Sequence, residues 1–257
     1  LDEVSKHVNV DQWLTHLAVD SLLGNREGGL NDGKGDDYVL YRGIADPRFR
    51  FVPHDLDTLL RGNPTKNIWG YTALDGLERF LNHPDIIPLY YSKFLELLDR
   101  VYRPEIIQPV IARAVGGFLA NNVMEGMQEF VPDRIVNVLS QIPRNYSATS
   151  NLSLTAEGYF RTSSGAVIFS GDFHAANVRS VRVNGVNAQI NAKDGTWRLD
   201  VENGGGDVLN PGLNRVVVNF ISGKSATGTL QHVEYLDIWY DTGTVTELSG
   251  TLGGGAA

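Results

Sequence analysis

The spacing of hydrophobic positions along the chain changes near Pro143. Before this residue, apolar side chains recur every three or four positions, which is the period of one face of an α-helix. After it, short runs alternate apolar and polar residues and are separated by glycine, asparagine and aspartate, as strands and turns are. The pattern predicts a mainly helical first part and an all-β second part.

The first part begins with a helix predicted over residues 10–23. Asn9 or Asp11 can cap its start, and Gly24 with Asn25 ends it. Two apolar runs after a polar, glycine-rich stretch predict an antiparallel hairpin, and helical spacing returns after the hairpin. The predicted strands are 38–41 and 49–52, and the predicted later helices are 73–81, 86–101, 104–119 and 131–141, the last started by Pro132.

The second part reads as about seven short strands, a number and spacing typical of a β-sandwich. Two dipeptides, Asn184-Gly185 and Asp194-Gly195, are hairpin turn signals because both tolerate positive φ angles. The predicted strands are 152–156, 166–172, 178–183, 189–192, 196–201, 214–221 and 234–240.

We therefore expect an α+β, multidomain chain. A mainly helical domain with a β-hairpin would occupy residues 1–145, an all-β sandwich 146–243, and a linker or tail 244–257. The start has neither a basic segment nor the apolar run of a signal peptide, and it lacks a methionine. Both ends suggest a piece of a larger protein.

The composition is that of a globular chain, with 42% hydrophobic and 20% charged residues among 257. No apolar run approaches the roughly 20 residues of a membrane-spanning helix, so we expect no membrane span. The net charge of −8 argues against a nucleic-acid partner. The absence of cysteine excludes disulfides, thiolate metal sites and a cysteine nucleophile.

Carboxylates cluster around the predicted hairpin. Because a hairpin brings its two ends together, acids before its first strand and after its second strand can converge and bind a hard divalent cation. A solvated acidic loop beside a turn is the alternative, and the spacing alone favours neither. The acids before the hairpin are Glu27, Asp32, Asp36 and Asp37, and those after it are Asp55 and Asp57.

Three runs in this region resemble the CotH family, the spore-coat-type atypical protein kinases found in bacterial secreted and envelope proteins. They are LAVDSLLGN (17–25), DDYVLYR (36–42) and DPRFRFVPHDLDT (46–58). Shorter matches follow at 68–69, 77–84, 90–91 and 138–143, so the resemblance covers about residues 9–143.

The resemblance implies a kinase-like fold in which carboxylates position a metal–ATP complex for phosphate transfer to a hydroxyl of a protein substrate. The implied cofactors are ATP and Mg²⁺ or Mn²⁺. Glu27 stands where the family has an aspartate as catalytic base, and Asp37 where an asparagine often binds metal. The family's metal-binding acid is kept as Asp55, with Asp57 beside it.

Four further residues have supporting roles in this interpretation. Asn25 precedes the predicted base, and Asp36 adjoins Asp37. His54 is a metal ligand or base, or else orients the neighbouring loop. Asp20 supports the acidic loop from the last turn of the first helix.

A phosphoryl-transfer enzyme also needs a phosphate-covering loop and a basic residue on the nucleotide phosphates. The sequence before Trp13 contains neither a glycine-rich nucleotide loop nor a lysine-bearing strand. The resemblance therefore implies that this chain contains the carboxyl-terminal lobe of a kinase-like domain. We expect the chain to be inactive by itself, and we expect kinase activity only in a longer parent protein that also contains the upper lobe.

Two stretches of the second part, 194–197 and 209–214, resemble bacterial immunoglobulin-like modules of extracellular proteins. Trp239 and Tyr240, at a strand end, are candidates for stacking on sugar rings, whereas Trp197 is expected in the sandwich core. The alternative function is thus a non-catalytic, secreted or cell-surface protein that binds a surface or polysaccharide partner.

Overall fold

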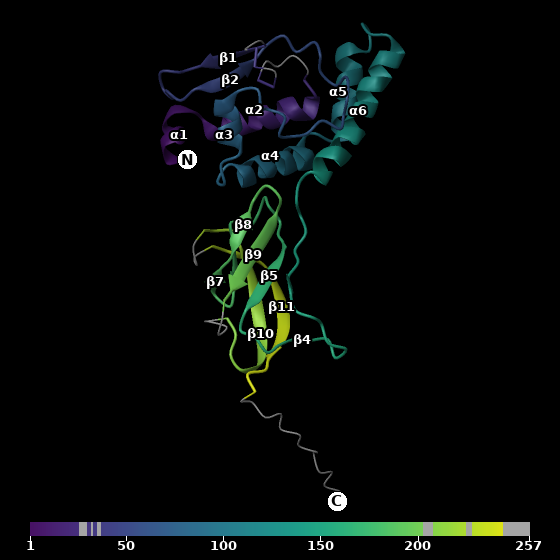
Figure 1. The fold of residues 1–257 in the computed structure, drawn as a ribbon. Helices are drawn as coiled ribbons and strands as arrows, with labels where there is room; N and C mark the ends of the chain where they lie inside the picture. Colours follow the sequence, from purple (N-terminus) through teal and green to yellow (C-terminus); the bar gives the residue numbers. More distant parts are fainter. Residues whose placement is uncertain (26–29, 32, 35–36, 203–207, 225–227, 244–257) are drawn as a thin grey trace, which may run out of the picture. The chain divides into compact units, whose positions relative to one another are not determined.

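Helices dominate the first part of the chain and strands the second, so the predicted α+β class is confirmed. The computed structural model describes residues 1–25, 30–31, 33–34, 37–202, 208–224 and 228–243. Figure 1 shows the helices in purple to teal and the larger sheets in green to yellow. The chain divides into two units, one of Leu1–Arg144 with His174–Asn177 and Ala192–Asp194, and one of the residues that remain.

Helix α2 (Val10–Leu23) is the central helix of the first unit, and its predicted bounds are confirmed. The Asn9 side chain accepts a hydrogen bond from the Gln12 amide at 3.1 Å and so caps the start. Gly24 ends the helix in the left-handed region, at φ 63°. The buried positions of α2 are Leu14, Leu17, Ala18 and Leu22.

The other helices of this unit are α1 (Asp2–His7), α3 (Asp75–Leu81), α4 (Ile87–Arg100), α5 (Pro104–Val115) and α6 (Asn121–Ser140). The sequence pattern missed α1, because six residues are too few to display a helical period. Helix α4 packs against α2 and buries Tyr90, Tyr91 and Phe94. No helix of the described residues is long and apolar enough to cross a membrane.

The prediction that a helix starts at Pro132 is wrong, because α6 begins at Asn121 and contains Pro132 in its interior. A proline there has no N–H for the carbonyl four residues earlier, which belongs to Gln128. The Gln108 side chain of α5 donates to that carbonyl at 3.1 Å, and the Gln128 side chain donates to the Gln108 carbonyl at 3.2 Å. A tertiary contact thus replaces the missing helical bond.

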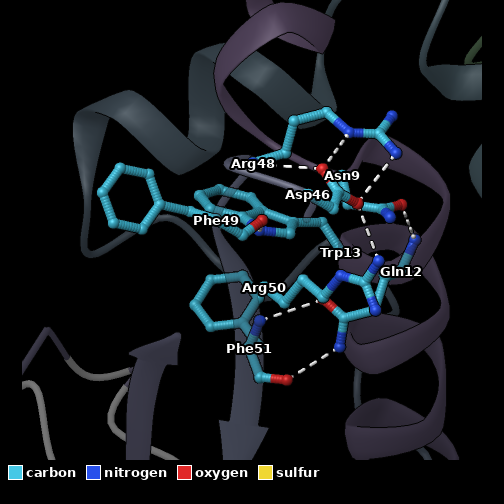
Figure 2. A network of polar contacts seen from close by, with 8 residues as sticks. All are labelled: Asn9, Gln12, Trp13, Asp46, Arg48, Phe49, Arg50 and Phe51. Atoms are coloured by element: carbon cyan, nitrogen blue, oxygen red, sulfur yellow. Dashed lines mark hydrogen bonds and ion pairs between the residues drawn. The ribbon is translucent and has the colours of Figure 1, made fainter. Parts of the chain in front are cut away.

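The predicted hairpin forms from β1 (Tyr38–Tyr41) and β2 (Arg50–Pro53), with Tyr38 opposite Pro53. Figure 2 shows how α2 holds the second strand. The Gln12 side chain both donates to the Phe51 carbonyl, at 2.7 Å, and accepts from the Phe51 amide, at 2.9 Å. The Trp13 indole donates to the Phe49 carbonyl at 2.9 Å. The hairpin is therefore tied to α2 along its backbone.

Asp46 organises the chain between the two strands (Figure 2). Its carboxylate accepts from Arg48 Nε at 2.8 Å and from Arg50 Nη2 at 2.7 Å. These hydrogen bonds hold the pKa of Asp46 well below its ordinary value. The Asp46 carboxylate therefore stays charged at ordinary pH and stabilises the turn through its ion pairs with Arg48 and Arg50.

The second unit contains two sheets. One has the order β3-β5-β9-β8, all antiparallel, and the other has the order β4-β11-β10-β6-β7, in which β4 runs parallel to β11. Their bounds are β3 Thr149–Ser150, β4 Phe160–Thr162, β5 Val167–Asp172, β6 Ser180–Val183, β7 Val186–Asn187, β8 Gln189–Asn191, β9 Thr196–Val201, β10 Gly212–Ile221 and β11 Leu230–Tyr240.

The buried faces of the two sheets meet. Trp197 of β9 is 3% exposed and lies edge-on to Phe220 of β10, with ring centroids 6.2 Å apart. The expectation that Trp197 belongs to the core is confirmed. Asn184 and Gly185 both have positive φ in the tight turn from β6 to β7, as their sequence predicts.

The strand predicted over residues 152–156 is wrong. Pairing with β5 ends at Asn151, whose amide donates to the Ile168 carbonyl at 3.0 Å, and the Leu152 amide donates to the Ser150 hydroxyl at 3.3 Å instead of to a sheet neighbour. Only an isolated bridge joins Leu154 to Phe160. A serine side chain that competes for backbone donors is a local effect that alternation of hydrophobic residues does not reveal.

Candidate functional site

The loop after α2 starts from a fixed point at Gly24 and Asn25. A Cβ on Gly24 would lie 2.5 Å from Cζ of Phe130, so only glycine fits beside α6. Asn25 is 4% exposed, and its amide donates to the Asp20 carbonyl at 3.2 Å. The position that precedes the predicted base is therefore rigidly held, while Glu27 itself lies outside the described residues.

Asn25 also joins this loop to the segment after the hairpin. Its side-chain oxygen accepts from the Thr58 hydroxyl at 3.1 Å. Thr58 directly follows Asp57, so one hydrogen bond links the chain before Glu27 to the chain that carries the predicted metal-binding acids. The sequence pattern gave Asn25 a supporting role but assigned nothing to Thr58.

The ends of the hairpin lie side by side at the backbone. The His54 amide donates to the Asp37 carbonyl at 3.0 Å, continuing the β1–β2 ladder by one step. Asp37 is buried, at 7% exposure, whereas His54, Asp55 and Asp57 are exposed. The approach of the two hairpin ends is therefore as the sequence predicts.

Two aspartates at these ends have unusual backbone conformations. Asp37 has φ 56° and Asp55 has φ 50°, in the left-handed region that non-glycine residues seldom adopt. Such conformations cost about 1 kcal/mol or more each and persist only where their surroundings impose them. They aim both side chains in directions that an ordinary extended strand would not give.

Among the residues that the structure describes, no group of three or more aspartates, glutamates or histidines is placed to hold a metal ion. Asp36, like Glu27, lies outside the described residues. Asp37, Asp55 and Asp57 therefore do not form a complete protein cage by themselves. Their oxygen donors suit Mg²⁺ or Mn²⁺, and Mg²⁺ commonly binds through one or two carboxylates together with substrate phosphates.

Asp20 lies deeper in the fold than the other predicted acids. Tyr71 donates its hydroxyl to Asp20 Oδ2 at 2.9 Å and approaches the Leu17 carbonyl at 2.9 Å. Burial raises the pKa of Asp20, while hydrogen bonds from Asn25 and Tyr71 act in the opposite direction. Asp20 is thus held in the last turn of α2 by the Tyr71 hydroxyl, and its support of the acidic loop stays a prediction. Tyr71, 51 positions away, carries no sequence signal.

A large groove of about 720 Å³ runs beside the hairpin and is almost entirely apolar. Trp13, Tyr38, Phe51 and Phe80 contribute aromatic walls. Such walls offer few ligands to a metal or a phosphate.

The two aromatic residues proposed for sugar binding lie on opposite faces of β11. Side chains alternate along the strand, so Tyr240 faces the core with Leu236 and Ile238 and is 9% exposed. Its ring is not available for stacking, which corrects the prediction for Tyr240. Trp239 is partly exposed on the other face, with the 60% exposed Tyr235.

Comparison with known families matches residues 1–125 to the family described as CotH kinase protein. The matched range contains α1 to α5, the hairpin and every predicted site residue of the first unit. No curated protein matches the chain. The family uses ATP, in agreement with the cofactor expected from the sequence. Residues 1–125 of this chain are thus similar to the CotH kinase protein family.

Proposed function

We propose that the protein containing this domain transfers phosphate from a metal–ATP complex to hydroxyl groups of a protein substrate. The observation that carries the proposal is the joining of two hairpin ends, with Asp37 on one side and Asp55 on the other, inside the matched family range. Asp37, Asp55 and Asp57 are the proposed metal-binding residues, and Glu27 the proposed base. The metal would neutralise charge on the phosphates.

The chain's own contribution is positional. A 3.1 Å hydrogen bond from the Thr58 hydroxyl to the Asn25 side chain joins the end of α2 to the segment that carries Asp55 and Asp57. Because a displacement of about 1 Å can lower a rate about a hundredfold, this bond matters for catalysis even though neither residue contacts a reacting atom. His54 supports the same segment through its backbone bond to Asp37.

Calorimetry with manganese–ATP, and transfer of labelled phosphate to a protein acceptor, test this function in the chain and in its full-length parent. We expect Asp55→Ala to abolish nucleotide binding and transfer. Asp99→Ala, which removes an acid from α4, is the matched control and should leave both unchanged. Absence of heat and transfer in the chain and the parent, with both folded, would contradict the proposal.

A second function is favoured by the outward face of β10 and β11. On β11, Tyr235 and Trp239 flank Asp237, which forms a two-pronged ion pair with Arg215 at 2.9 and 3.0 Å. Aromatic rings separated by planar polar groups suit a neutral glycan, because sugar rings stack on indoles and phenols while hydroxyls bond to the polar groups.

We propose that this face binds a polysaccharide of a cell surface in a secreted or surface-attached, immunoglobulin-like module. Pull-down on insoluble glycans tests it. Trp239→Ala and Tyr235→Ala should each reduce the bound fraction. Tyr41→Ala, which removes a 57% exposed tyrosine from β1, should not. Retention that is equal for all these variants would overturn the glycan proposal and leave the kinase proposal unaffected.

A further inference from the structure

Arg134 is a buried charge whose hydrogen-bond partners in the described structure are all uncharged. It comes from α6 and is 1% exposed. Its guanidinium donates to the backbone carbonyls of Ser21, Pro64 and Lys66 and to the side chains of Ser21 and Asn137. These bonds stabilise the cation but leave its charge uncompensated by a carboxylate, an arrangement that is costly in a protein interior.

Arg134 lines a cavity of about 300 Å³, hereafter the Arg134 cavity. The volume equals that of roughly ten waters in the liquid, so a tetrahedral oxyanion fits with room to spare. Besides Arg134, its polar lining includes Lys66, Asn67, Asn31, Asn25 and Asp20. Lys66 and Asn67 are exposed, whereas Asn25 is buried, so the cavity runs from the surface to the interior.

Two groups of the lining have unused hydrogen-bonding capacity. Asn31 Oδ1 is buried and accepts no hydrogen bond within the described structure. Arg134 Nη2 carries two hydrogens and, with the residues that the structure describes, makes one hydrogen bond, to the Ser21 hydroxyl at 2.8 Å. A buried acceptor without a partner is unfavourable, so a ligand that supplies a donor to Asn31 Oδ1 binds more tightly.

We propose that the Arg134 cavity binds a small tetrahedral oxyanion of the phosphate class, free or as a phosphate ester. The anion would receive hydrogen bonds from Arg134 and Lys66, and its own hydroxyl would donate to Asn31 Oδ1. This binding goes beyond the proposed phosphotransfer and does not depend on it.

The charges of the lining favour an anion over a cation. Among the described residues of the lining, Arg134 and Lys66 contribute two positive charges and Asp20 contributes the single acid. The Asp20 carboxylate is already engaged by Tyr71, at 2.9 Å, and by Asn25. A cation would face two positive side chains and one acid among the described residues of the lining, whereas an oxyanion offers the counter-charge that the guanidinium lacks.

The experiment titrates the full chain with inorganic phosphate, at constant ionic strength, by calorimetry and by ³¹P line broadening. Lys66→Ala removes an exposed charge without disturbing the core, so it should weaken binding about fivefold or more. Asp20→Asn keeps an acceptor for Tyr71 but removes the negative charge, so it should tighten binding. Lys6→Ala, whose lysine pairs with Glu3 on α1, is the matched control and should change nothing.

A second titration with phosphoserine distinguishes the two sources of the group. Tighter binding of phosphoserine than of phosphate would identify a phosphate ester as the ligand, and the reverse would identify the free ion. Absence of binding of both, or equal affinity in Lys66→Ala and the unmodified chain, would overturn the proposal. Weaker binding in Asp20→Asn would also overturn it, because it would show that the cavity favours positive charge. Loss of kinase activity alone would not affect these outcomes.

Discussion

At the scale of single residues, the first unit depends on a few side chains whose surroundings allow only one residue type or one charge state. His16 is such a residue, because it lies in α2 with its ring stacked on Phe51 at 4.9 Å between centroids. Burial lowers the pKa of His16, and the nearby Asp20 opposes that effect. The neutral imidazole is thus the form that the fold accommodates.

His16 should make stability depend on pH. A base whose pKa is lower in the folded chain than in the unfolded chain stabilises the fold above its ordinary pKa of 6.5 and loses that contribution as pH falls through the lowered value. Urea unfolding between pH 7.5 and 5 should therefore show a smaller fall in the free energy of unfolding for His16→Gln than for the unmodified chain. Thr15→Ala should have the same pH profile as the unmodified chain. Equal profiles for the unmodified chain and His16→Gln would contradict this prediction.

Gly24 should be intolerant of any side chain. Alanine there would have a left-handed backbone at φ 63° and a Cβ 2.5 Å from the Phe130 ring, so we expect Gly24→Ala to lower the free energy of unfolding by about 2 kcal/mol. Gly126 in α6 has no atom within 4 Å of a built Cβ, and Gly126→Ala should raise stability by about 0.5–1 kcal/mol. Denaturant unfolding measures both, and effects of the same sign would contradict the argument.

At the scale of elements, the hairpin and α6 take their shape from neighbours. β1 and β2 make a two-stranded sheet, which is marginal in water without packing on another element. The side chains of Gln12 and Trp13 on α2 provide that packing, because they hydrogen-bond to the backbone of Phe51 and Phe49. The same logic holds for α6, where Gln108 satisfies the carbonyl that Pro132 leaves open.

Gln12→Ala should loosen the hairpin more than it destabilises the unit. The change removes both bonds to Phe51, each worth about 0.5–1.5 kcal/mol. Hydrogen exchange of the β1 and β2 amides should accelerate about tenfold, while the α4 amides keep their protection. Gln231→Ala is the control, because the Gln231 side chain bonds to the Thr229 carbonyl and to no other residue that the structure describes. Unchanged exchange in the hairpin of Gln12→Ala would show that Trp13 suffices.

At the scale of the whole molecule, two units with different architectures each need their own core. In the second unit, Phe220 is fully buried and contacts the rings of Tyr146, at 5.2 Å, and Trp197, at 6.2 Å. It joins the two sheets of that unit. The first unit has its own aromatic core, in which Tyr90 lies 4.8 Å from Phe94.

Phe220→Ala should therefore destabilise the second unit by about 3–5 kcal/mol, the usual cost of removing a buried ring. Denaturant unfolding, followed by near-ultraviolet circular dichroism and by exchange of the β10 and β11 amides, measures the effect. Tyr235→Ala, on the outward face of β11, should cost less than about 0.5 kcal/mol. Similar losses for both variants would contradict the assignment of the core face.

The amino-acid sequence by itself determined the change from helices to strands along the chain, the bounds and caps of α2, the hairpin and the turn at Asn184-Gly185. These features depend on local periodicity, capping and φ preferences, which a single sequence displays. The residues around Glu27, Asp37 and Asp55 also carried the family resemblance that the match over residues 1–125 bears out.

Only the tertiary structure decided the remaining features. Pro132 lies inside α6, where the Gln108 side chain of α5 bonds to the Gln128 carbonyl that the proline leaves without a helical partner. Tyr240 is buried because alternation along β11 places it on the core face. The hydrogen bond between Asn25 and Thr58 joins residues 33 positions apart. In the Arg134 cavity, the hydrogen bond from Arg134 to Ser21 joins residues 113 positions apart. Hydrophobic spacing indicates which face of its own helix or strand a residue occupies. It does not indicate which residue far away in the sequence that face contacts, because those contacts form only when the helices and strands pack together.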